Sequence, residues 1–207
     1  MDTKILSECP IRYNAAGILD AMAKKIEIMN GRPSLDLSTT DIDLFSAYNI
    51  AAYAYDVLVE YGPQAIEDNR HHRVTKALED VCFINIALTG VIANITRSFR
   101  QSALAHLFYD GIRTHFYLES RDALHGEIVA VGLFIQLYYN RLSDQEARLR
   151  AFMKGLDMKL TMDECGVPST DENLAILEAY MIDSPHVDPT EENLKYLHEA
   201  MKRVRPS

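Results

Sequence analysis

The sequence of this 207-residue chain predicts an all-α fold of roughly eight helices, formed by a single domain over residues 1–207. Apolar residues recur at three- and four-residue steps over most of the chain, which is the spacing of helix faces. Residues that commonly begin helices, such as Thr170 and Thr190, precede several of these segments. No strand pattern longer than four or five residues stands out.

Each expected helix is bounded by residues that commonly start or stop helices. The first nine residues are expected to be extended, up to Pro10. Ser143 and Glu146 form a capping box, and Thr170 and Thr190 open two further helices with similar starting sequences. The other helices are expected over residues 11–29, from Thr40 to Gly62-Pro63, briefly from Gln64, and over residues 72–95, 102–115, 123–139 and 143–153.

One expected helix differs from the others in having apolar residues on nearly every side. This pattern runs from Phe83 to Ile95. A helix that is apolar all round is usually surrounded by protein. The pattern therefore predicts that this segment is central to the core.

Composition and charge exclude several classes of protein. The chain is 48% apolar and 25% charged, which excludes a disordered tail, a collagen-like fibre and a disulfide scaffold. Its net charge of −9 has the wrong sign for binding nucleic acid through phosphates. The longest apolar stretches, such as residues 128–137, are far shorter than the roughly 20 residues that span a bilayer. We therefore expect no nucleic-acid partner and no membrane partner.

The cysteines and the N-terminus indicate a cytoplasmic location. Cys9, Cys82 and Cys165 are widely spaced and odd in number, as expected for free thiols in a reducing compartment. No signal-peptide pattern opens the chain. A glycine-rich loop for nucleotide phosphates, of the GxGxxG or GxxxxGK[ST] type, is also missing from the sequence.

Two histidines and one aspartate are candidates for a metal site. His106 lies on a helix whose other face is apolar, and His125 opens the next helix, so a short turn between antiparallel helices could bring both imidazoles to one point. Asp20 lies on an otherwise apolar helix face, where an unpaired carboxylate is costly. Two imidazoles and a carboxylate can hold a catalytic zinc or ferrous ion. From spacing alone, hydrogen-bonded core histidines are the commoner explanation.

Three segments resemble motifs of the glycerol dehydrogenase family. They are residues 2–13 with Gly17-Ile-Leu-Asp-Ala-Met-Ala, Ala105-His106 with Asp110-Gly111, and His125-Gly-Glu-Ile-Val-Ala-Val-Gly with Gln136. The first resembles the interdomain segment and first metal-ligand helix of the family, and the other two resemble its histidine motifs. The resemblance implies the helical, metal-binding C-terminal domain of the superfamily that also contains iron-containing alcohol dehydrogenases and dehydroquinate synthases.

By matching position, the resemblance implies that Asp20, His106 and His125 are the metal ligands. Dehydroquinate synthases place a glutamate where Asp20 stands. Iron-dependent alcohol dehydrogenases add a histidine one helical turn later, where this chain has Lys24. The three-ligand pattern therefore implies zinc, with iron as the alternative.

The resemblance also suggests substrate-binding residues. Tyr109 and Asp110 stand where glycerol dehydrogenases often carry histidine and asparagine. Arg97 and Arg100 lie where those enzymes carry a Ser-Gly-Gly stretch, and two arginines suit a phosphate or carboxylate. A solvated loop or an internal salt bridge is the alternative for the arginines. The sequence identifies no catalytic general base.

The family's enzymes bind NAD through an N-terminal α/β domain, whereas all 207 residues resemble the C-terminal half, with residues 1–10 matching the interdomain connection. The resemblance implies the catalytic half of an NAD-dependent dehydrogenase for a small alcohol or polyol, with a phosphorylated or anionic substrate as one option. NAD would bind only through a separate or deleted α/β domain, so we expect the isolated chain to be inactive. Without that domain the apolar residues of the lead, Met1 to Tyr13, would lose their cover, so we also expect a homo-oligomer. The alternatives are a non-catalytic domain that binds a small anionic ligand or a partner chain, and a metal-dependent hydrolase or lyase.

Overall fold

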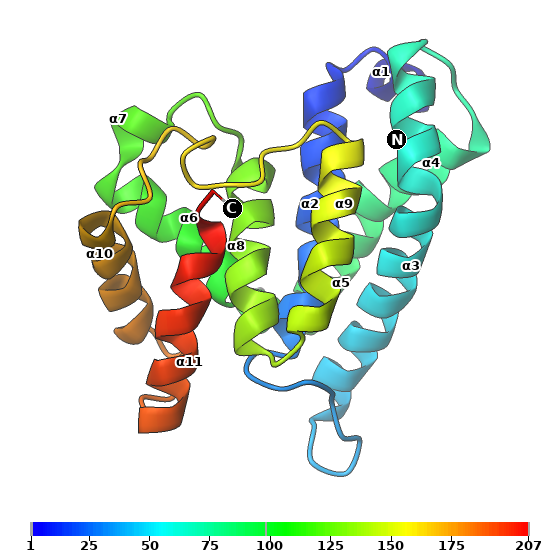
Figure 1. Cartoon of the computed structure of the whole chain (residues 1–207). Helices are drawn as coiled ribbons and strands as arrows, with labels where there is room; N and C mark the ends of the chain where they lie inside the picture. Colours follow the sequence, from blue (N-terminus) through cyan, green and yellow to red (C-terminus); the bar gives the residue numbers. More distant parts are fainter. Residues whose placement is uncertain (1, 98, 207) are drawn as a thin grey trace.

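Helices are the only regular secondary structure in the described part of the chain, residues 2–97 and 99–206 of a computed structural model (Figure 1). The elements α4, η1 and α5 form one continuous helix. Counted in this way, the described residues contain eight helices of seven or more residues, and the prediction of an all-α fold is confirmed. The elements are α1 (Thr3–Ser7), α2 (Ile11–Ile28), α3 (Ile42–Arg70), α4 (Lys76–Phe83), the π-helix η1 (Ile84–Leu88), α5 (Thr89–Ile95), α6 (Leu104–His115), α7 (Tyr117–Ser120), α8 (His125–Tyr139), the 3₁₀ turn η2 (Ser143–Gln145), α9 (Glu146–Gly155), α10 (Asp171–Ile182), α11 (Glu191–Met201) and the 3₁₀ turn η3 (Lys202–Val204).

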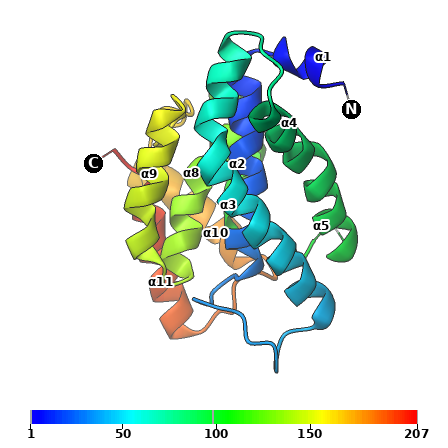
Figure 2. The same ribbon diagram turned by 90° about the vertical axis from the view of Figure 1, so that its right-hand side faces the viewer.

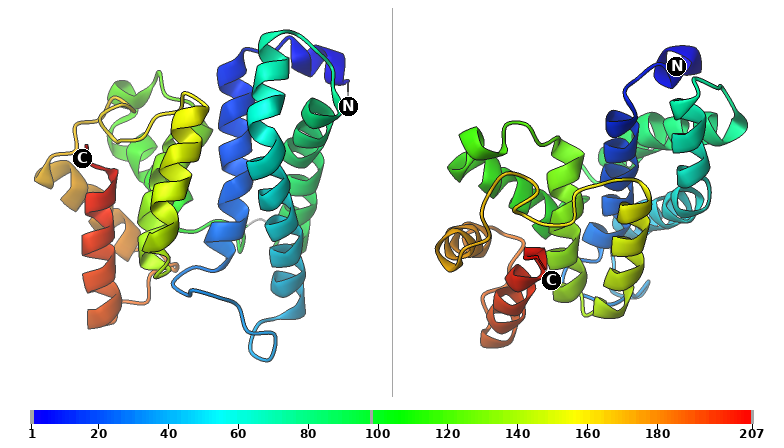
Figure 3. Two further views of the ribbon diagram at one scale, coloured as in Figure 1. Left: turned by 45° about the vertical axis from the view of Figure 1, so that its right-hand side comes forward. Right: turned by 45° about the horizontal axis from the view of Figure 1, so that its top comes forward.

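Helix α8 lies between two apolar clusters and is buried along almost its whole length. Leu133 and Phe134 on one side of α8 belong to a cluster with α2, α3, α4 and α9. Val131 and Ile135 on the other side belong to a cluster with α6, α10 and α11. Figures 1 and 3 show these two groups of helices on opposite sides of α8.

The N-terminal lead is helical, so the prediction of an extended lead is wrong. The Asp2 carboxylate caps α1 by accepting a hydrogen bond from the Lys4 backbone N–H at 3.0 Å. The lead also folds back on α3, where the Asn69 side chain donates to the backbone carbonyls of Ser7 and Cys9. Ile5 stays exposed on its outer face.

Helix α3 continues through Gly62 and Pro63 to Arg70, whereas the sequence predicted its end at this pair. A proline removes one hydrogen bond from a helix interior. Burial compensates for that loss, because Ala65 and Ile66 continue the buried face of α3 beyond the proline. The short helix expected from Gln64 is therefore the last part of α3.

The continuous helix from Lys76 to Ile95 lies at the edge of the fold, so its predicted central position is wrong (Figure 2). Phe83, Ile86 and Val91 are exposed. Helix α4 also begins later than predicted, because the Thr75 hydroxyl caps it by accepting from the Leu78 N–H.

By length and composition alone, this same segment could cross a membrane. Its best 18-residue window has a mean hydropathy of 1.5, and 28% of that window is buried. The segment does not stand out as an uninterrupted apolar run in the sequence, because Asn85 and Asn94 break it.

The two similar starts near the C-terminus are helix caps, as predicted. The Thr170 hydroxyl accepts from the Asn173 N–H at the start of α10, and the Thr190 hydroxyl accepts from the Asn193 N–H at the start of α11. By contrast, the expected capping box at Ser143 is a 3₁₀ turn that leads into α9.

Candidate metal site

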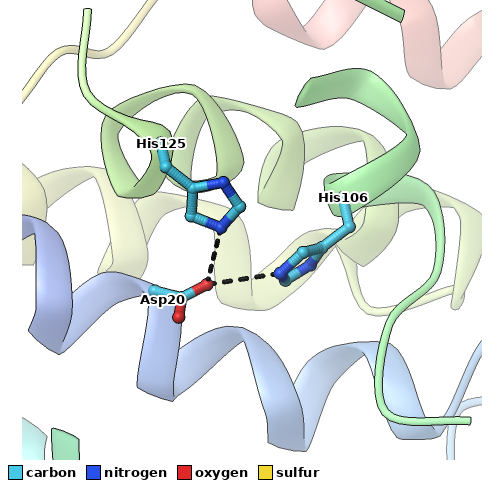
Figure 4. Close-up of side chains that lie close together, drawn as sticks. All are labelled: Asp20, His106 and His125. Carbon is cyan, nitrogen blue, oxygen red and sulfur yellow. Dashed lines mark ion pairs between the residues drawn. The ribbon is translucent and has the colours of Figure 1, made fainter. Parts of the chain in front are cut away.

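Three side chains that can bind metal meet where α2, α6 and α8 come together (Figure 4). Asp20 is on α2, His106 is on α6, and His125 is the first residue of α8. Asp20 Oδ1 lies 3.3 Å from Nε2 of His106 and 3.3 Å from Nε2 of His125. One potential ligand atom from each residue lies within 4.8 Å of the other two. The structure thus brings together all three residues that were predicted as ligands.

The distances suit a small divalent cation. In a tetrahedral zinc site with bonds of about 2.0–2.2 Å, neighbouring ligand atoms are about 3.4 Å apart. Both distances from Asp20 Oδ1 are already close to this value. Oδ1 is also buried, and no described residue gives it a hydrogen bond of ordinary geometry. Because this buried oxygen lies at ligand–ligand distance from two imidazole nitrogens, the Asp20 carboxylate fits the role of a metal ligand.

Close packing of α2 against α8 sets the position of His125. A Cβ atom on Gly126 would lie only 2.3 Å from the backbone oxygen of Ala16, so only glycine fits at this crossing. Arg12, in the first turn of α2, donates to both carboxylate oxygens of Glu127 at 2.5 Å. The starts of α2 and α8 are therefore tied together beside the site.

Glu27, which the sequence reasoning missed, orients His106. Its side chain is fully buried, and Oε2 lies 2.6 Å from His106 Nδ1. Oε1 accepts from the backbone N–H groups of Ala103 and His106, at 2.7 and 2.9 Å. Because an ionised carboxylate can only accept, the proton of a neutral His106 lies on Nδ1, and the Nε2 lone pair is free for a metal. The spacing of Asp20, Lys24 and Glu27 along one helix face could have revealed this residue.

Lys24 also lies inside the site. Its Nζ is 3.1 Å from His106 Nε2 and 3.6 Å from Asp20 Oδ1, and its side chain is only 6% exposed. The sequence identified Lys24 only as the residue at the position of an additional histidine in related enzymes. The structure shows that its ammonium group contacts two of the three candidate ligands.

The buried charges shift one another's pKa values. Burial opposes ionisation of Asp20, but the neighbouring imidazoles and the Lys24 ammonium outweigh it and hold the pKa of Asp20 well below its usual range. Burial likewise opposes ionisation of Glu27, yet the charge of His106 lowers the Glu27 pKa. For His106, burial disfavours the charged form, but Glu27 and Asp20 together raise the pKa to about 9. A metal must therefore displace a proton from His106 in neutral solution.

The site opens to solvent beside His125. A pocket of about 280 Å³ is lined by Tyr13, Ala16, Gly17, Asp20, Leu124, His125 and Gly126. The His125 side chain is 45% exposed, whereas the His106 side chain is 16% exposed. A small molecule could therefore approach the cluster from the side of His125 and Asp20.

The structure places one of the four predicted substrate residues against the site. The Tyr109 ring packs edge-on against the His125 ring, with 4.2 Å between centroids. Asp110 and Arg97 are exposed. Arg100 forms ion pairs with Asp41 at 2.8 Å and Asp43 at 3.1 Å, which corresponds to the internal salt bridge considered as its alternative role. Substrate binding by these residues stays a prediction.

The chain is similar to glycerol dehydrogenases, although no family model matches it. It is 29% identical to the glycerol dehydrogenase of Thermotoga maritima over 186 residues, which cover 84% of this chain and 47% of that protein. It is 33% identical to the glycerol dehydrogenase of Pseudomonas putida over 149 residues, which cover 70% of this chain and 39% of that protein. A crystal structure of glycerol dehydrogenase from Schizosaccharomyces pombe matches 98% of this chain and 52% of its own, with a TM-score of 0.76 and 25% identity. The chain thus spans about half the length of the curated relatives it matches.

Proposed function

Because the chain is homologous to the C-terminal part of glycerol dehydrogenases, we propose that it is the metal-binding half of an NAD-dependent oxidoreductase for a small alcohol or polyol. The observation that carries this proposal is the convergence of Asp20, His106 and His125 within 4.8 Å of one another. Zinc is the proposed ion because nitrogen and carboxylate ligands in a three-residue set suit catalytic zinc. Iron is the alternative.

The chain's own residues prepare the site for this chemistry. A bound divalent ion would polarise a substrate hydroxyl and lower its pKa, which favours hydride transfer to a nicotinamide. Glu27 keeps the Nε2 lone pair of His106 available, and the lowered pKa of Asp20 keeps its carboxylate ionised. The Tyr109 ring restricts rotation of His125. We propose that an α/β domain outside these 207 residues holds the nicotinamide.

An uncharged alcohol or polyol fits the site better than an anion. Arg100 is already paired with Asp41 and Asp43, so its charge is satisfied within the chain. The residues that line the pocket beside Asp20 and His125 include no lysine or arginine to pair with an anion. We therefore propose a neutral substrate, and Arg97 remains the candidate contact for a phosphorylated one.

Elemental analysis of protein purified without chelators tests the metal site. We expect about one zinc per chain after equilibration with micromolar zinc. Asp20→Asn and His125→Ala should lose the ion, whereas His198→Ala should keep it, because His198 is an exposed histidine paired with Glu178 on another part of the surface. Equal metal content in all four proteins would contradict the assignment.

The oxidoreductase part of the proposal needs the nicotinamide-binding half. We expect the reading frame that precedes this chain to encode a glycine-rich α/β domain. Co-expression of that domain with this chain should give NAD-dependent oxidation of glycerol that is lost in Asp20→Asn. A preceding frame of another kind, together with no NAD-linked activity, would favour the non-catalytic alternative.

A further inference from the structure

A second cation is already built into the candidate metal site. Lys24 lies one helical turn after Asp20, on the same face of α2. Its Nζ reaches His106 Nε2 at 3.1 Å and Asp20 Oδ1 at 3.6 Å, from a side chain that is almost completely buried. The ammonium therefore approaches the ligands from the protein interior, whereas the pocket opens beside His125.

The ammonium and a metal ion would need the same electron pair. In the neutral form that a metal requires, His106 carries its proton on Nδ1, where Glu27 Oε2 accepts it. The Nε2 atom then has one lone pair. An ammonium has three N–H donors and no acceptor, so once His106 has given up the proton that a metal displaces, the Lys24 Nζ at 3.1 Å can only donate to that lone pair. One lone pair cannot hold both partners.

Charge acts in the same direction. Asp20 and Glu27 together balance one dication when His106 and His125 are neutral. When the Lys24 ammonium is added to these two carboxylates and the dication, the largely buried cluster has an excess positive charge. Like charges a few ångströms apart in such surroundings repel strongly. Before the metal binds, by contrast, the ammonium partly compensates the two buried carboxylates.

We propose that Lys24 is an internal competitor for the metal: it stabilises the metal-free site and lowers the metal affinity, so that the ion stays exchangeable. This inference rests on the proposed metal site. It extends that proposal by assigning the affinity of the site to a residue that is not a ligand. The ammonium must move away from His106 Nε2 when the ion binds, and that displacement is what reduces the affinity.

Zinc titration against a chromophoric chelator, at one fixed pH, tests the inference. Lys24→Met removes the charge while filling a similar volume, and Lys24→Gln is a second neutral variant in case the first folds poorly. Both should bind zinc about tenfold more tightly or better, because the repulsion is gone. Lys24→Arg keeps the charge and should bind with the weak affinity of the unmodified chain. Lys25→Met is the matched control, since Lys25 lies over the Tyr55 ring and near Asp56.

Thermal unfolding provides a second readout that does not depend on catalysis. Without metal, Lys24→Met should unfold at a lower temperature than the unmodified chain, because the buried carboxylates lose one of their counter-charges. Zinc should then raise its unfolding temperature by more than it raises that of the unmodified chain.

The outcomes separate this inference from the metal site itself. Tighter zinc binding by both neutral variants, with Lys24→Arg unchanged, supports the competition. Equal or weaker binding by the neutral variants, while the unmodified chain binds zinc, overturns the role of Lys24 and leaves the metal site standing. If neither the unmodified chain nor the neutral variants bind zinc, both the site and the inference are wrong.

Discussion

Replacing Glu27 with glutamine tests how His106 is held for metal binding, because this change keeps the size of the side chain and removes its charge. Glutamine can keep its oxygen on the backbone N–H groups of Ala103 and His106, which are the present partners of Glu27 Oε1. Its amide group then faces His106 Nδ1, where Oε2 now lies at 2.6 Å. An amide donates to Nδ1, so the imidazole proton moves to Nε2 and blocks the atom that should bind metal.

The size of the effect follows from that change of tautomer. Losing the partner that orients a metal-binding histidine typically costs 10–100-fold in metal affinity, or about 1.4–2.7 kcal/mol. The negative charge that supports the dication is lost as well. We therefore expect Glu27→Gln to bind zinc about 10–100-fold more weakly than the unmodified chain, as measured by calorimetry or chelator competition near pH 7.5.

The matched control is Glu146→Gln. Glu146 is another buried carboxylate, but it pairs with Arg150 and Arg203 on α9 and near the C-terminus. This variant should lose stability and keep its zinc affinity. If the Glu27→Gln variant folds normally and its zinc affinity is within twofold of that of the unmodified chain, Glu27 does not orient His106 for metal binding.

Three further predictions concern stability. The pKa of His106 is raised from 6.5 to about 9 in the folded chain, so the stabilisation by its charge is complete below pH 6.5 and is lost as the pH rises through 9. In urea unfolding of metal-free protein, the free energy of unfolding should fall by up to roughly 3 kcal/mol over this pH range, and the fall should be absent in His106→Gln. Gly126→Ala should lower the free energy of unfolding by about 2–3 kcal/mol and weaken zinc binding, because the new Cβ would push α8 away from Ala16. An unchanged urea midpoint and an unchanged zinc affinity would contradict the close packing of α8 on α2. Thr190→Ala should cost about 1 kcal/mol in the same assay through loss of the α11 cap, and no change would show that the cap is dispensable.

The sequence predicted the cluster of Asp20, His106 and His125 because three residues of chemically distinctive type lie in segments that resemble a known family. The groups around these candidate ligands were harder to predict. Lys24 and Glu27 are charged residues of types that usually face solvent, and only the packing of α6 against α2 shows that both are buried. Arg100 shows the reverse case, since a basic residue predicted to contact substrate pairs with carboxylates at the start of α3.

Helix existence was predicted better than helix position. The periodic apolar pattern defined α2 almost to the residue, because a local pattern and a local stop signal agree there. The position of the helix from Lys76 to Ile95 depends on which faces its neighbours cover, and an apolar sequence does not contain that information. The continuation of α3 past Pro63 likewise depends on burial of Ala65 and Ile66, which is a tertiary effect.

The position of α8 between the two apolar clusters has a consequence for how the chain unfolds. Each cluster uses one side of α8, so neither can come apart without exposing the same helix. We expect one cooperative transition, with the backbone amides of α8 the slowest to exchange with deuterated solvent. Asp20 comes from α2 in one cluster, His106 from α6 beside the other, and His125 from the shared helix. An ion held by all three would therefore act as a cross-link between the two halves, and it would slow exchange throughout the molecule rather than only around its binding site.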